Sequence, residues 1–192
     1  MTVQLHRHFK LYKPIRTLSQ FVNNQMHRRN KGLLGGLHDF PEGTMAIGRL
    51  DENSEGLLLL TTDGKVSYEL LSRKYEKEYY VQVDGLVDGT TALQLEAGVP
   101  ITIQGKPYTT LPCRVRCIDT PTLPAGWKIR DDRHGPTSWL SVTLTEGKYR
   151  QVRKMTAAVG YPTLRLVRVR VGNITLADMQ PGEVIEMDNL LS

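Results

Sequence analysis

The 192-residue sequence predicts an α+β fold, in which a mixed, largely antiparallel β-sheet is flanked by helices. Three observations predict this class. Short segments with period-two alternation, typical of strands, recur along the chain. Segments with helical periodicity interrupt them and carry helix start and stop residues. No internal repeat, low-complexity run or linker divides the chain, and its length suits one domain, or at most two lobes of one core.

The first predicted elements surround a polar turn. "MAIGRL" (45–50) predicts a short strand. "LLLLTT" (57–62) predicts a buried strand rather than a helix, because it is short and ends in threonines. "DENSEG" (51–56) is therefore expected to form the turn that joins them.

Two helices and a strand are predicted next. The first helix has its N-cap at Thr62 or Asp63. "KEYYVQVDG" (77–85) returns as a strand with period-two valines, and "GTTALQLEAG" (89–98) predicts a short helix closed by Gly98. The predicted apolar positions of the first helix are Val66, Leu70 and Leu71.

The second half contains further strands, a loop and a helix. Residues 99–119 predict strands with a turn at "QGKP", and "SWLSVTLTEG" (138–147) predicts another by its alternation. Residues 120–137 are rich in proline, glycine and charge, so they are expected to form a loop. "EGKYRQVRKMTAAVGYP" (146–162) predicts a helix that Gly160 ends. Its apolar face holds Val152, Met155 and Val159, and its other face holds Arg150, Arg153, Lys154 and Ala157.

The last long strand, "PTLRLVRVRVGNITL", changes phase along its length. Arg165 occupies an odd position, whereas Arg168 and Arg170 occupy even ones. A β-bulge near Leu166 and Val167 would put all three arginines on one face. The alternative is a strand that switches its buried side along its length.

The cations are unevenly distributed, although the formal net charge is only +5. Fourteen of the 25 lysines and arginines lie in two segments without any acid, 1–38 and 148–177. This pattern is typical of a surface that contacts phosphates. The alternative is a solvated surface whose acids come from other segments. The cations are Arg7, Lys10, Lys13, Arg16, Arg28, Arg29, Lys31, Lys148, Arg150, Arg153, Lys154, Arg165, Arg168 and Arg170.

Composition excludes several classes of protein. No apolar run approaches the roughly 20 residues that cross a bilayer, so a membrane protein is not expected. The N-terminus lacks a secretory signal, which predicts a cytoplasmic protein. Cys113 and Cys117 would lie about 13 Å apart on one strand, too far to bridge, so both are expected to be reduced. The five histidines are scattered, so no metal site is predicted.

Asp51 is the candidate catalytic residue. It follows a strand and precedes a turn that leads directly into a buried strand, which suits a preorganised carboxylate. Two alternatives remain at this point. An aspartate here often accepts hydrogen bonds from turn amides, and with Glu52 and Glu55 it could hold magnesium.

Three motifs together resemble one enzyme family. "GRLDENSEGLLLLTTDG", "KEYYVQVDG" and "LTEGKYRQVRKMTAAVGYPTLRLVRVRVGNITL" occur in the order found in the RsuA/RluB/RluE/RluF family of ribosomal RNA pseudouridine synthases. "YKP" (12–14) resembles the opening Lys-Pro motif of that family, and the similarity extends from about Leu11 to Asp188. The N-terminal S4-like RNA-binding domain of other members is not expected here, which would leave RNA binding to the catalytic domain.

The resemblance implies an activity and a fold. The reaction is isomerisation of a uridine in ribosomal RNA to pseudouridine, without a cofactor or metal. The target is expected in 23S rRNA of the large subunit, with small-subunit rRNA as the alternative. The implied fold is a single catalytic domain over 1–192 with a central catalytic cleft, a flexible tail over 1–8 and a monomeric state. A non-catalytic rRNA-binding or ribosome-assembly protein and a base-excising glycosylase are the competing functions.

The resemblance also assigns residues. Asp51 matches the family's catalytic aspartate, which acts at C1′ of the sugar or at C6 of the base. Tyr79 matches the active-site tyrosine, which can stack on a flipped uracil, whereas Tyr80 should point to the opposite face. Arg153 matches the basic residue that pairs with the aspartate and orients it. The residues expected to contact RNA are Lys13, Arg49, Lys148, Arg150, Lys154, Arg165, Arg168 and Arg170.

Overall fold

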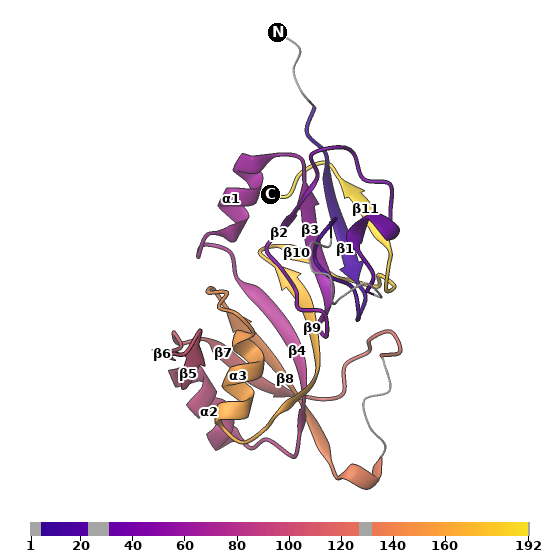
Figure 1. Cartoon of the computed structure of the whole chain (residues 1–192). Coiled ribbons are helices and arrows are strands. Elements are labelled where there is room, and N and C mark those ends of the chain that lie inside the picture. Colours follow the sequence, from indigo (N-terminus) through magenta and orange to yellow (C-terminus); the bar gives the residue numbers. More distant parts are fainter. Residues whose placement is uncertain (1–4, 23–30, 127–131, 192) are drawn as a thin grey trace. The chain divides into compact units, whose positions relative to one another are not determined.

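The computed structural model describes residues 5–22, 31–126 and 132–191. It divides the chain into two compact units (Figure 1). The first comprises Met1–Tyr75 and Arg170–Ser192, and the second comprises Glu76–Val169. Each unit has its own hydrophobic core.

The first unit is built on antiparallel strands. β1 pairs with β3 and with β11, and β2 pairs with β3. The short β10 pairs with the end of β9. A parallel bridge between Thr17 and Gly32 joins two loop segments of this unit. The elements are β1 (His8–Lys13), a 3-10 turn η2 (Leu34–Gly36), β2 (Met45–Ile47), β3 (Glu55–Thr61), α1 (Gly64–Leu71), β10 (Ile174–Thr175) and β11 (Val184–Met187).

The leucine run forms the centre of the first unit, as the sequence predicts. All seven residues of β3 are buried. Leu58 and Leu60 pack with Phe9 and Leu11 of β1 and with Leu34. A buried strand is confirmed here, because a strand flanked on both sides by others and packed on its face has no exposed side. Its bounds differ from the predicted 57–62, since β3 begins at Glu55, in the predicted turn, and ends at Thr61.

Helix α1 follows the prediction at its start and departs from it at its end. The Asp63 carboxylate caps the helix by accepting from the Lys65 amide at 2.8 Å. Val66 and Leu70 are buried, four residues apart on one face. Leu71 was expected to share this face, but its side chain is 53% exposed, because adjacent helical residues point about 100° apart.

The second unit contains the remaining long strands, in the order β9-β4-β8-β7. β4 runs antiparallel to β8 from the pair Lys77–Leu144 to the pair Asp84–Thr137, and β7 runs antiparallel to β8. β5 and β6 form a separate hairpin. The elements are β4 (Lys77–Asp84), α2 (Gly89–Ala97), β5 (Pro100–Ile103), β6 (Lys106–Thr109), β7 (Arg114–Ile118), a 3-10 turn η3 (Asp132–His134), β8 (Thr137–Leu144), α3 (Gln151–Ala158) and β9 (Thr163–Val171).

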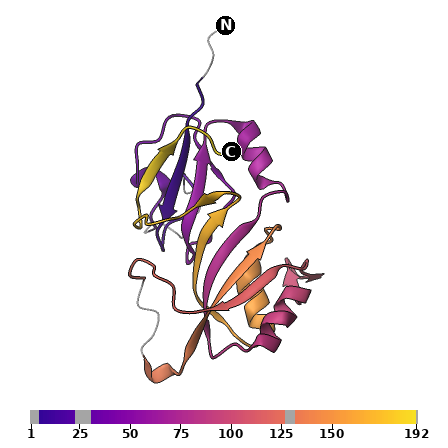
Figure 2. The same ribbon diagram turned by 180° about the vertical axis from the view of Figure 1, so that it is seen from behind.

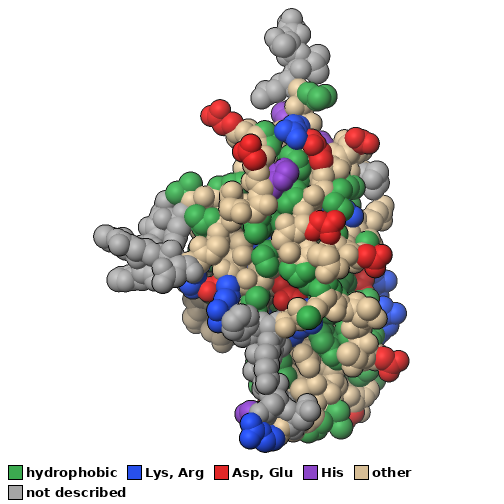
Figure 3. All heavy atoms as spheres, turned by 90° about the vertical axis from the view of Figure 1, so that its right-hand side faces the viewer, with side chains coloured by type: hydrophobic (Ala, Val, Ile, Leu, Met, Phe, Trp, Pro, Cys, Tyr) green, Lys and Arg blue, Asp and Glu red, His purple; other side chains and the backbone are tan. Residues whose placement is uncertain are grey.

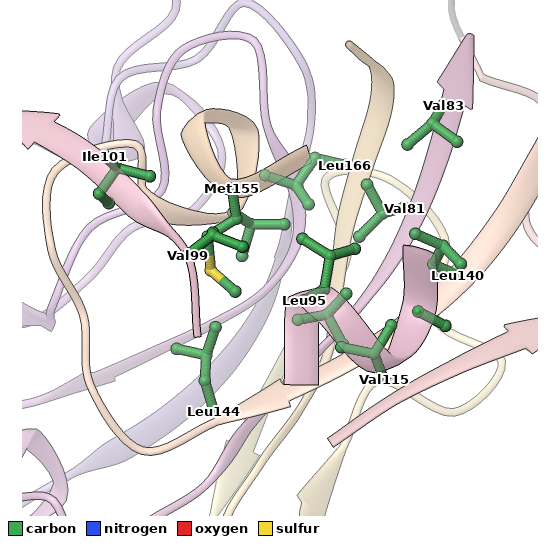
Figure 4. Close-up of a cluster of buried hydrophobic side chains, with 13 residues drawn as sticks. Val81, Val83, Leu95, Val99, Ile101, Val115, Leu140, Leu144, Met155 and Leu166 are labelled. Carbon is green, nitrogen blue, oxygen red and sulfur yellow. The ribbon is translucent and has the colours of Figure 1, made fainter. Parts of the chain in front are cut away.

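Helices α2 and α3 cover one face of this second sheet, which Figure 2 shows from behind. Leu95 of α2 and Met155 of α3 pack with Val81, Leu140 and Leu166 from three strands (Figure 4). The period-two valines of β4 and the apolar positions of α3 therefore meet in one core. The predicted α+β class, with a largely antiparallel sheet flanked by helices, is confirmed.

The two cysteines are unbridged, as expected. The Cys113 thiol approaches Leu95 O at 3.5 Å, and burial raises its pKa to about 11. Cys117 is exposed on β7 and approaches Val87 O at 3.8 Å. Cys113 precedes β7 and is half-buried, whereas Cys117 lies on β7, at the edge of the sheet.

The predicted loop and tail fall partly outside the described residues. Residues 119–126 contain no helix or strand, and a single 3-10 turn, η3, occupies Asp132–His134. The predictions for 127–131 and for 1–4 lie outside the part of the chain that the structure describes. No helix within the described ranges is long and apolar enough to span a membrane.

Candidate active site

Asp51 lies in the turn between β2 and β3, and hydrogen bonds hold the chain on both sides of it. The buried Ser19 hydroxyl accepts from the Leu50 amide at 3.0 Å and donates to Leu50 O at 2.9 Å. The Ser54 amide donates to Asp51 O at 3.0 Å and closes the turn. The half-buried Asp51 side chain is therefore carried on a fixed backbone, as a preorganised group requires.

Glu52 in the turn and Glu55, the first residue of β3, also have partners in the first unit. Glu52 O accepts from the Arg16 amide at 2.8 Å, and the Glu52 carboxylate forms an ion pair with Lys31. Glu55 is buried and accepts from the Tyr12 hydroxyl at 3.0 Å. Among the described residues, no group of three His, Cys, Asp or Glu side chains is arranged to hold a metal ion.

Tyr79 lies on β4, opposite Val142 of β8. Its half-buried ring packs against the core cluster that also contains Val81. It therefore lies on the face of the sheet that α2 and α3 cover. Alternation along the strand puts Tyr80 on the opposite face, which agrees with the predicted difference between these tyrosines.

Lys77 shares the face of Tyr79, two residues along the same strand. Its ammonium donates to Thr145 O at 3.4 Å. Burial lowers the pKa of Lys77, and the charge of Arg168 lowers it further. Lys77 was not among the predicted site residues, although its spacing from Tyr79 is the signal that could have identified it.

Arg153 lies on α3 and is half-buried. Its Nη1 donates to Thr163 O at 3.4 Å. The Thr156 and Thr163 hydroxyls form a hydrogen bond of 2.7 Å, which joins the middle of α3 to the first residue of β9. Arg153 is thus anchored within the second unit on an element whose position is fixed by packing.

The three predicted catalytic residues are divided between the units. Asp51 belongs to the first, and Tyr79 and Arg153 belong to the second. Their joint action stays a prediction. Ser19 is a further candidate that the sequence analysis missed, because its bonds to Leu50 join residues 31 positions apart and leave no local pattern.

Comparison with known proteins identifies the family. The profile of the RNA pseudouridylate synthase family matches residues 7–158, a span that includes Asp51, Tyr79 and Arg153. The chain belongs to this family. The family resemblance inferred from the motifs is thereby confirmed.

Two relatives illustrate how far the likeness extends. Ribosomal large subunit pseudouridine synthase E of Vibrio parahaemolyticus serotype O3:K6 is 42% identical over 179 residues, which cover 89% of this chain and 69% of the relative. The synthase of the same name from Xanthomonas campestris pv. campestris is 43% identical over 177 residues, covering 90% of this chain and 91% of the relative.

The fold agrees with that of a solved member of the family. A crystal structure of a pseudouridylate synthase superposes with a TM-score of 0.76 at 24% identity, covering 97% of this chain and 72% of that chain. At this identity the likeness supports the fold alone.

Lys13, one of the residues predicted to contact RNA in this synthase, is instead surrounded by protein. Its side chain is fully buried, and its ammonium donates to Pro14 O at 2.9 Å and to Thr17 O at 2.7 Å. A phosphate cannot reach it in this structure, so the contact predicted for Lys13 does not fit. The lysine instead holds the turn that leads from β1 towards Ser19.

The cations around the start of α3 are more accessible. Lys148 is exposed, and Lys154 is half-buried with its ammonium 2.7 Å from Thr102 O. Arg150 was expected within the helix, but it precedes the first helical residue and has a left-handed backbone with φ of 52°.

Arg49, beside Asp51, is exposed. Arg28 and Arg29 lie outside the described residues.

The arginines of β9 do not form one exposed patch. The strand is continuous from Thr163 to Val171. Arg165 donates to Pro124 O at 2.9 Å, whereas Arg168 is buried and its charge acts on Lys77. Arg170 donates to Gly172 O at 2.9 Å. These different partners do not decide between a bulge and a strand that exchanges its buried side, and contacts of these arginines with RNA stay a prediction.

The charged side chains on the described surface do not separate into a basic and an acidic region on the face shown in Figure 3. On the face in Figure 3, basic and acidic side chains are interspersed over the described residues. Arg7, in the acid-free N-terminal segment, pairs with Glu186 at 2.6 Å, and Lys31 pairs with Glu52. Acids from distant segments thus neutralise part of the predicted basic footprint, which is the alternative that the charge pattern left open.

Proposed function

We propose that the protein converts one uridine of large-subunit, 23S ribosomal RNA to pseudouridine. The observation that carries the proposal is the identity of 42–43% to two large-subunit synthases over about nine-tenths of this chain. Family membership supports the reaction class, and the names of these relatives support the ribosomal substrate.

The proposed reaction is an isomerisation in which every atom of the nucleotide is retained. The bond between N1 and C1′ breaks, a bond between C5 and C1′ forms, the C5 proton leaves and N1 gains a proton. Asp51 is proposed to act as the nucleophile, at C1′ of the sugar or at C6 of the base. The hydrogen bonds that fix Leu50 and close the turn at Ser54 support this role, because a nucleophile must be held in a productive position.

Two residues of the second unit complete the proposed chemistry. Tyr79 offers a half-buried ring that can stack on a uracil turned out of its helix, at a cost that RNA contacts must offset. Arg153 is proposed to orient the Asp51 carboxylate by charge-assisted hydrogen bonds. The protein is further proposed to act as a monomer in the cytoplasm, where ribosomal RNA is its substrate.

Mapping of pseudouridine tests this function. Carbodiimide-dependent reverse-transcription stops are compared in rRNA from cells with and without the gene. We expect one stop in 23S rRNA to disappear with the gene and to return when the wild-type protein is supplied.

The competing functions give other results. Unchanged stops would contradict the proposal and favour a non-catalytic rRNA-binding protein. A lost stop in small-subunit RNA would move the target. Release of uracil from RNA by the purified protein would identify a glycosylase.

A further inference from the structure

An exposed tyrosine stands at the start of α3. Tyr149 belongs to the short segment between β8 and α3, and its side chain is 64% exposed. Exposed aromatic rings are costly to leave in water and are common where a protein binds unstacked bases.

A buried carboxylate organises the segment. Glu146 is buried, and its Oε1 accepts from the Leu111 amide at 2.9 Å and from the Gln151 side chain. Its Oε2 accepts from the Tyr108 hydroxyl. Gln151 in turn accepts from the Lys148 amide at 2.9 Å. Both ends of the segment that carries Tyr149 are thus tied to one network inside the second unit.

The network coincides with an uncommon backbone conformation. Arg150, the residue after Tyr149, has φ of 52° and ψ of 34°, a region that residues other than glycine rarely adopt. Such conformations persist only where the surroundings impose them, and they occur often at binding sites. The segment is therefore a rigid support rather than a loose connection.

Two lysines complete the surface. The Lys154 ammonium lies 5.3 Å from the centroid of the Tyr149 ring, and the Lys148 ammonium lies 4.9 Å from the centroid of the Tyr108 ring. The only nearby acid in sequence, Glu146, is buried and already accepts three hydrogen bonds. Aromatic rings between cations provide stacking and phosphate contacts together.

We propose that Tyr149 is a stacking platform for an unpaired base of the ribosomal RNA substrate. Lys154 covers one face of the ring and leaves the other for the base, and Lys148 contacts a backbone phosphate. The inference rests on the proposed function, since it deepens RNA recognition by the same enzyme. It adds a residue that carries no charge and that the basic segments alone did not indicate.

Substitution of Tyr149 tests the platform. The dissociation constant of an rRNA fragment is measured by filter binding, alongside the single-turnover rate at saturating RNA. Tyr149→Ala should raise the dissociation constant on the order of tenfold, because base stacking is lost. Tyr149→Phe should keep wild-type affinity, and both variants should keep the wild-type rate once saturated. Tyr68→Ala is the matched control, because Tyr68 is also exposed, at 80%, but lies on α1 of the first unit; it should leave affinity unchanged.

The salt dependence separates stacking from charge. Lys148→Met should reduce the slope of log affinity against log salt by about 0.7, whereas Tyr149→Ala should leave the slope unchanged. Wild-type affinity of Tyr149→Ala, or an equal loss in Tyr68→Ala, would overturn the proposal. A wild-type protein that binds the RNA without turnover would instead contradict the proposed function, and the dissociation constants would still decide the role of Tyr149.

Discussion

At the scale of single residues, the placement of Asp51 depends on Ser19. One hydroxyl serves both backbone groups of Leu50, as acceptor from the amide and as donor to the carbonyl. A buried side chain that makes two such bonds leaves two backbone groups unsatisfied when it is removed. The peptide that carries Asp51 would then be free to rotate, and a misplacement of about 1 Å is enough to slow a reaction substantially.

Ser19→Ala should therefore lower the rate at saturating RNA by about tenfold, or about 1.4 kcal/mol, with little change in RNA affinity. Ser19→Thr, which keeps the hydroxyl, should recover much of the rate. The measurement is single-turnover kinetics with RNA in excess.

Ser138→Ala is the control, because the Ser138 hydroxyl makes the same two kinds of backbone hydrogen bond as Ser19. Ser138 also accepts from one amide, of Val87 at 3.0 Å, and donates to one carbonyl, of Gly85 at 2.8 Å, but it belongs to the second unit. It should cost stability without slowing the reaction. Equal rate losses in both alanine variants would refute a positioning role for Ser19.

Single residues also show which contacts the sequence could not predict. Asp51 was singled out because it lies between a strand and a turn that leads into a buried strand. Only the family resemblance gave it a catalytic role, and that role stays a prediction. Lys13 was assigned to RNA because the sequence shows its charge and no acid nearby, but it cannot show the carbonyl groups of Pro14 and Thr17 that surround the ammonium. Ser19 was missed for the same reason, since its partner is distant in sequence.

At the scale of elements, α2 ends at a glycine that the fold requires. Gly98 has φ of 97°, and a Cβ built there would lie 2.3 Å from Thr110 O. Gly89, at the start of the same helix, has nothing within 4 Å of such a Cβ. The two glycines therefore form a matched pair for a test of local structure.

Gly98→Ala should lower the free energy of unfolding by about 1–3 kcal/mol. Alanine is strained at a positive φ, and its Cβ would collide with Thr110 O. Gly89→Ala should be neutral or stabilising, by up to about 1 kcal/mol. Urea unfolding followed by circular dichroism gives both values. Equal effects of the two substitutions would show that the end of α2 is not constrained in this way.

Elements were predicted best where the signal is local. The cap of α1 at Asp63, the end of α2 at Gly98 and the leucine strand all depend on neighbouring residues, and all are confirmed. The arginines of β9 could not be assigned to faces from sequence, because the answer depends on distant groups such as Pro124 and Lys77.

At the scale of the whole molecule, two separately packed units carry one family's set of motifs. The order of the motifs along the chain was sufficient to predict the family and the α+β class. It was not sufficient to predict whether a segment rich in cations forms a basic surface. Ion pairs such as Arg7–Glu186 join residues far apart in sequence and neutralise some of these cations.

The central claim is that Asp51 is the nucleophile of a pseudouridine synthase. The most direct measurement is release of tritium from rRNA labelled at uridine C5, with filter binding of the same RNA. Asp51→Asn is nearly isosteric, but an amide is not a comparable nucleophile. We predict that wild-type protein releases tritium, and that Asp51→Asn releases none while its RNA affinity stays within about tenfold. Sustained tritium release by Asp51→Asn would contradict the claim.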